Sequence, residues 1–138
     1  MTALRNLQAL QPGGRSTGAL LWLVCVVDAG LLVASGLIHL HLWDIAYRHV
    51  KVLDVLFPVQ VAAAIIAAVL LLATRNLLIV IGSALLMIGT VAGFILARTA
   101  GIFGFHLTFS SGLADAVLVV EAAAILMLVV TAAMLVRR

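Results

Sequence analysis

The chain has one cysteine, two prolines and few charged residues among its 138 residues. The lone cysteine, Cys25, has no partner within the chain, which excludes a thiol–disulfide oxidoreductase that works through two cysteines of its own. Only 9% of the residues are charged, and the lysines and arginines are scattered. The net charge of +3 therefore does not indicate a nucleic-acid surface, which would need clustered basic residues.

The chain also lacks the common sequence signatures of catalysis. It has no catalytic-triad pattern, no glycine-rich loop of the kind that holds phosphate and no pair of closely spaced cysteines. These absences remove the usual motifs of hydrolases, nucleotide-binding enzymes and thiol enzymes. The sequence therefore favours a protein that is not an enzyme.

Apolar residues are what the chain has in abundance, at 66% of its composition with a mean hydropathy of +1.35. A soluble domain of this size cannot bury so much apolar surface. A helix needs about 20 apolar residues to cross the hydrocarbon core of a bilayer. Runs of that length predict an all-α membrane protein with four transmembrane helices, at residues 19–43, 52–73, 77–97 and 113–136.

Short links between the runs predict how the four helices are arranged. Thr74–Asn76 leaves room only for a tight turn, which makes the second and third helices antiparallel neighbours. The sequence therefore predicts an antiparallel up-down bundle that forms a single domain over residues 19–138. Residues 1–18 are more polar and contain the helix-breaking pair Pro12–Gly13, so we expect them to form a retained cytoplasmic tail.

Basic residues favour one orientation of this bundle in the plasma membrane. With both termini in the cytoplasm, five basic residues lie inside and three lie outside, and an excess of basic residues on the cytoplasmic side is the usual pattern. All four histidines and three aspartates then gather at the outer end. The inner residues are Arg5, Arg15, Arg75, Arg137 and Arg138, and the outer ones are Arg48, Lys51 and Arg98.

Two acidic residues lie inside the predicted spans, where a charged carboxylate is costly. Asp28 lies about 13 Å from the start of the first span, and Glu121 about 12 Å from the start of the fourth. Asp28, Ser35 and His39 fall within about 40° of one another on the first helix, and Gln60 of the second span can face them. We expect this buried polar stripe to face the bundle interior, with at least one acid protonated or hydrogen-bonded.

Three hypotheses account for these polar residues. In the first, His39 and His106 at the outer end ligate haem b, copper or zinc, supported by Asp28 or Glu121. In the second, Asp28 and Glu121 are proton or cation sites of a small transporter, and the histidines relay protons to the surface. In the third, the polar groups satisfy one another inside an accessory or scaffold subunit.

Other residues at the outer end suit the membrane interface. His41 lies on roughly the opposite side of the first helix from His39, so these two histidines are not expected to share an ion. We predict that His41, Trp43, Tyr47 and His49 are interfacial anchors, because amphipathic rings prefer the headgroup region.

Glycines mark two further features. Gly82, Gly89 and Gly93 share one face of the third span, which predicts a seam of close helix packing. The segment 98–112 combines glycines with Phe103, Phe105, His106 and Phe109. It suits a loop on the outer surface that either caps a cavity or lies as an apolar loop in the membrane–water interface.

Four stretches have a distinctive order and spacing: IHLHLW, AYRHVKVLDVLFPVQ, GTVAGFILARTAGIFGFH and VVEAAA. Together they resemble a group of short four-span membrane proteins found mainly in actinobacteria, over most of residues 35–125. The resemblance implies a fold and a setting but no chemistry, because no activity is assigned to the group. An acidic residue tends to follow the GFH position in that group, whereas this chain has Leu107, so the loop lacks that carboxylate beside His106. Small multidrug transporters are similar in size, but they carry a single acid in the first span.

The sequence thus favours a small integral membrane protein with the lipid bilayer as its surroundings and no nucleic-acid partner. It acts either as an accessory subunit of a larger, for example respiratory, membrane assembly or as a binder of metal or haem at its outer end. The alternative is a proton- or cation-coupled transporter that uses Asp28 and Glu121. Other membrane subunits or a second copy of the chain are the protein partners to expect.

Overall fold

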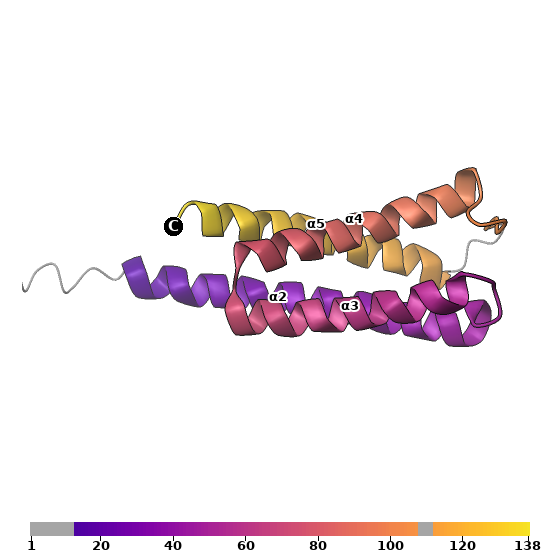
Figure 1. The fold of residues 1–138 in the computed structure, drawn as a ribbon. Coiled ribbons are helices and arrows are strands. Elements are labelled where there is room, and N and C mark those ends of the chain that lie inside the picture. Colours follow the sequence, from indigo (N-terminus) through magenta and orange to yellow (C-terminus); the bar gives the residue numbers. More distant parts are fainter. Residues whose placement is uncertain (1–12, 108–111) are drawn as a thin grey trace, which may run out of the picture.

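The computed structural model describes residues 13–107 and 112–138, and these form an all-α bundle. Figure 1 shows four long helices that run up and down side by side, which confirms the predicted antiparallel four-span bundle. The elements are α2 (Gly13–Leu42), the short π-helix η1 (Trp43–Tyr47), α3 (Leu53–Thr74), α4 (Leu77–Thr99) and α5 (Gly112–Val136). Residues 13–18, predicted as part of the tail, are helical; Arg5 and Pro12 lie outside the described residues.

Each of the four helices is long and apolar enough to cross a bilayer. Large apolar side chains cover the outside of the bundle, and Leu78 and Val119 are 75% and 70% exposed. In water such a surface would be unstable, whereas in a membrane it contacts acyl chains. The chain is therefore a multi-pass membrane protein whose apolar surface faces lipid.

The turn between α3 and α4 is as short as the sequence predicts. Arg75 adopts a left-handed conformation (φ 47°), and its N–H donates to the Leu71 carbonyl at the end of α3. The Asn76 side chain then accepts a hydrogen bond of 2.8 Å from the Leu78 N–H and caps α4. These two residues reverse the chain between the membrane spans.

The helices do not pack equally tightly. The contacts of α2 with α3 are the most extensive, and α5 packs against both α2 and α4. Of these neighbouring pairs of long helices, α3 and α4 touch least. Figure 1 shows α3 and α4 diverging from their shared turn toward the other end of the bundle. A compact apolar core therefore surrounds α2, with Cys25, Leu32, Leu71, Met87 and Leu128 all fully buried.

The glycine seam on α4 is not a contact between helices of this bundle, contrary to the prediction. A Cβ atom built on Gly82, Gly89 or Gly93 meets nothing within 4 Å among the described residues. The close approach involves Gly36 of α2 instead, where a Cβ would lie 3.5 Å from the Cβ of Ala64 on α3. Gly36 is the residue that lets α2 and α3 approach closely.

Two irregular segments close the end of the bundle that contains His39, called the His39 end below. η1 continues α2 with a wider turn, in which the Arg48 N–H donates to the Trp43 carbonyl, and the chain then enters α3 through Val52 at φ 76°. Between α4 and α5, a tight reverse turn spans Ile102–Phe105, with paired backbone hydrogen bonds of 2.7 and 2.8 Å. Its two central residues have positive φ, as a primed turn requires.

Candidate functional site

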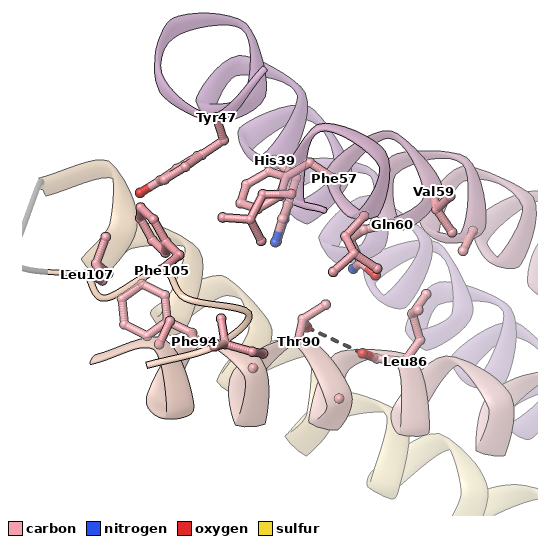
Figure 2. A pocket seen from close by; sticks show the side chains of 17 residues that line it. His39, Tyr47, Phe57, Val59, Gln60, Leu86, Thr90, Phe94, Phe105 and Leu107 are labelled. Atoms are coloured by element: carbon pink, nitrogen blue, oxygen red, sulfur yellow. Dashed lines mark hydrogen bonds between the residues drawn. The ribbon is translucent and has the colours of Figure 1, made fainter. Parts of the chain in front are cut away.

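A cavity of about 360 Å³ lies where α3 and α4 diverge at the His39 end. Its walls come from α2, η1, α3, α4 and the segment after α4, and Figure 2 shows side chains from these elements pointing into the space between them. Most of the lining side chains are apolar. The lining residues are His39, Tyr47, Leu53, Leu56, Phe57, Val59, Gln60, Ala63, Leu86, Gly89, Thr90, Gly93, Phe94, Ala97, Ile102, Phe105 and Leu107.

Aromatic rings form one side of this cavity. The Tyr47 ring lies 4.9 Å from the Phe57 ring and 5.7 Å from the Phe105 ring, which it meets edge-on. The His39 ring packs against the Phe57 ring, with a distance of 5.3 Å between the two ring centroids. The wide turn of η1 brings Tyr47 to the side of the bundle that His39 occupies, so Tyr47 lines the cavity rather than serving only as the predicted interfacial anchor.

A buried polar cluster stands beside the cavity. The Ser35 hydroxyl on α2 donates a hydrogen bond of 3.1 Å to Glu121 Oε1 on α5, and these residues are 0% and 1% exposed. His39 Nδ1–H donates to the Ser35 carbonyl at 2.9 Å, which leaves Nε2 at 3.7 Å from the same Glu121 oxygen. His39 Nε2 and the Glu121 carboxyl group are thus close enough to interact electrostatically, but they lie beyond hydrogen-bond distance.

Gln60 on α3 is the second buried polar residue in the cavity wall. It is 7% exposed, and its Nε2 atom has no hydrogen-bond partner in the described part of the chain. Figure 2 shows this side chain directed toward α4, where Thr90 lines the facing wall. The Thr90 hydroxyl already donates to backbone carbonyls of its own helix, at 2.8 Å to Met87. Gln60 is thus a hydrogen-bond donor without an acceptor, which is costly in an apolar setting.

Asp28 and Glu121 do not form one site. Asp28 accepts a hydrogen bond from the Thr131 hydroxyl of α5, and its other oxygen, Oδ1, has no partner among the described residues. Ser35 lies seven residues further along α2, about 10 Å away along the axis. The fully buried Leu32 and Leu128 lie in the core between the two pairs. The predicted stripe is buried throughout, but it divides into two polar pairs with apolar side chains between them.

His39 lines the cavity, whereas His106, its predicted partner in a metal or haem site, does not. His106 is exposed, and its Nε2–H donates to the Thr99 carbonyl at 3.3 Å, whereas Phe105 and Leu107 on either side of it line the cavity. Successive side chains of an extended segment point to opposite sides, so two inward neighbours turn His106 outward. Within residues 13–107 and 112–138, no group of three or more His, Cys, Asp or Glu side chains is placed to hold a metal ion.

The remaining residues of the His39 end are mostly exposed. His41 and His49 are exposed, as interfacial residues would be, and Trp43 donates from its indole N–H to the Asp54 carbonyl at 2.9 Å. Trp43 therefore also ties η1 to the start of α3. The loop after α4 lines the cavity through Ile102, Phe105 and Leu107, in agreement with the first of its two interpretations. Phe103 is exposed, and Phe109 lies outside the described residues.

Three residues of the candidate site were not predicted from the sequence. Thr131 and Thr90 are hydroxyl residues inside long apolar runs. Thr131 lies at the depth of Asp28 and Thr90 at the depth of Glu121, and these matching depths could have indicated the contacts. The carboxyl group of Glu121 has Thr90 beside it as well as Ser35. Phe57 gave no signal, because its contact with His39 depends on how α2 and α3 are rotated against each other.

The fold and the site define a class: a four-helix, multi-pass membrane protein with a buried polar cluster next to a cavity between two of its spans. Comparisons of the chain with protein-family models, with curated proteins and with solved structures found no match.

Proposed function

We propose that this protein binds a small lipid-soluble molecule in the cavity between α3 and α4. The observation that carries the proposal is the unpartnered Gln60 amide, which is buried in the wall of a cavity whose other walls are mostly apolar. Ligand sites typically have volumes of about 300–1,000 Å³, apolar walls and a few well-placed polar groups. At about 360 Å³ the cavity suits a small ligand.

Water alone is a poor occupant for this cavity. An ordered water needs two to four polar partners, whereas most of the wall is built from side chains such as Leu56, Phe94 and Ala97. A molecule with an apolar body and a polar group contacts both kinds of wall. Of the neighbouring long helices, α3 and α4 pack least tightly. They border the cavity, and a ligand dissolved in the bilayer can enter between them.

A fluorescent naphthol, which is a flat apolar ring with one hydroxyl group, tests the proposal in lipid nanodiscs. We expect saturable binding of one naphthol per chain. Gly89→Leu places a side chain in the open cavity and should abolish that binding. Gly82→Leu is the matched control, since Gly82 also has free space around it but does not line the cavity. Equal binding by both variants, or no saturable binding by the wild type, would refute the proposal.

The metal and haem hypothesis loses support because His106 faces away from the cavity that His39 lines. A second candidate, the proton- or cation-coupled transporter, is favoured by the two acids buried inside one bundle, Asp28 at 0% and Glu121 at 1% exposed. Transport would need a rearrangement of the apolar side chains between the two polar pairs. Proton flux in proteoliposomes that is lost in Asp28→Asn would support the transporter over the binding protein.

We also propose an orientation with both termini in the cytoplasm and the His39 end on the outer side of the plasma membrane, on the strength of the basic-residue count. Ala46 in η1 is exposed, and Cys25, the one cysteine of the chain, is buried. A cysteine placed at Ala46 in the Cys25→Ser background should react with a membrane-impermeant maleimide added to intact cells. Labelling only after cell lysis would show that the His39 end lies on the cytoplasmic side.

Membership of the actinobacterial four-span group and a role as an accessory subunit are further proposals. The four sequence stretches support the first. The second is supported by α4, which is the least buried of the four helices and leaves apolar surface for another membrane subunit or a second copy. Native mass spectrometry from nanodiscs tests the second proposal, since a monomer under all lipid conditions would contradict assembly of this chain with itself.

A further inference from the structure

The walls of the cavity carry information about the chemistry of its ligand. Aromatic rings reach the cavity from four different segments: Tyr47 from η1, Phe57 from α3, Phe94 from α4 and Phe105 from the loop after α4 (Figure 2). Aromatic rings interact best with other rings, in offset-stacked or edge-to-face arrangements at centroid distances of about 4.5–7 Å. A flat aromatic ring therefore fits this part of the cavity better than a branched aliphatic body.

The charge of the walls excludes an anionic ligand. None of the described residues that line the cavity is Lys or Arg, and the Glu121 carboxyl group lies just behind His39. A carboxylate or phosphate would find no Lys or Arg among these lining residues and would meet the nearby Glu121 carboxyl group, at a large desolvation cost. Fatty acids and anionic phospholipid headgroups are thus poor occupants, and we expect a neutral ligand.

The polar groups indicate oxygen atoms on that neutral ring. Gln60 Nε2 is a donor that lacks an acceptor, and a carbonyl oxygen satisfies it. His39 Nε2 is the second polar edge, and Figure 2 shows a nitrogen of this ring directed into the cavity. With Nδ1–H donating to the Ser35 carbonyl, a protonated Nε2 donates to a carbonyl oxygen, and an unprotonated Nε2 accepts from a hydroxyl.

We propose that the cavity between α3 and α4 is a quinone site, in which Gln60 donates a hydrogen bond to one ring oxygen and His39, backed by Glu121, contacts the other. Quinones are flat, neutral, soluble in the bilayer and carry two oxygens on one ring, so they match each property of the walls. The His39–Glu121 pair accommodates both the carbonyl of the oxidised form and the hydroxyl of the reduced form. This assignment rests on the proposed function, since it names the ligand class of that same cavity.

Two probes of the same shape test the assignment in nanodiscs: 1,4-naphthoquinone with a short alkyl chain, and naphthalene with the same chain. We expect the wild type to bind the quinone at least tenfold more tightly than the hydrocarbon. Gln60→Leu should remove most of that preference and leave hydrocarbon binding intact. Ser83→Ala is the control, because the Ser83 hydroxyl donates to the Ile79 carbonyl of its own helix and does not line the cavity, and it should keep the preference.

Each outcome separates the quinone assignment from the proposed function. Equal affinity for the two probes, with both lost in Gly89→Leu, would overturn the quinone assignment while the cavity still binds ligands. A preference for the quinone that persists in Gln60→Leu would overturn the role given to Gln60. If neither the two probes nor the naphthol bind the wild type more tightly than they bind the Gly89→Leu variant, both the proposed function and the quinone site are refuted. The comparison of probes on the wild type remains decisive if Gln60→Leu does not fold.

Discussion

The hydrogen bond between Ser35 and Glu121 should contribute measurably to stability, because it joins α2 to α5 at full burial. The bond is 3.1 Å long, and its two residues are 0% and 1% exposed. Hydrogen bonds between membrane helices contribute about 0.6 kcal/mol on average and about 1.7 kcal/mol at most. We therefore expect a coupling of about 0.6–1.7 kcal/mol between Ser35→Ala and Glu121→Leu in a double-mutant cycle.

Reversible unfolding in mixed micelles titrated with SDS measures the four free energies of unfolding that the cycle needs. The low end of the range is expected if the freed Ser35 hydroxyl turns to a carbonyl of its own helix. Ser83→Ala with Glu121→Leu is the control cycle, since the Ser83 hydroxyl donates to the Ile79 carbonyl on its own helix at 2.7 Å and should show no coupling. Additivity of Ser35→Ala and Glu121→Leu within about 0.3 kcal/mol would refute the reasoning.

Three further substitutions test other parts of the structure. Asp28→Asn keeps an acceptor for the Thr131 hydroxyl, so its free energy of unfolding should be about 1 kcal/mol higher than that of Asp28→Leu. Equal free energies of unfolding for the two variants would contradict the buried Asp28–Thr131 hydrogen bond. Gly36→Leu should separate α2 from α3 and lower the melting temperature in detergent, whereas Gly82→Leu should not; equal shifts would show that α2 and α3 are not in close contact there. Val52→Gly relieves a strained positive φ of 76° that costs about 1–3 kcal/mol, so it should raise the melting temperature; a decrease would argue against that backbone conformation.

Much of the fold could be predicted from the sequence because it depends on the length of the apolar runs, the length of the links between them and the helical period. The length of an apolar run decides whether a helix can cross a bilayer, and Thr74–Asn76 is too short for anything but a reversal. The helical period likewise placed Asp28, Ser35 and His39 on one face, and the structure buries all three. Their burial follows from the cost of exposing polar groups to lipid, which the composition already implies.

The sequence by itself therefore determined the number of spans, their antiparallel order and which residues of the first span turn inward. Only the tertiary structure decided which groups meet. Glu121 pairs with Ser35, and Asp28 pairs with Thr131. His106 donates to the Thr99 carbonyl and does not line the cavity with His39. The physical reason is that the helical period specifies direction and depth on one helix, whereas contacts depend on the rotation and spacing of neighbouring helices. The divergence of α3 and α4, which opens the cavity beside Gln60, is set by packing across the whole bundle.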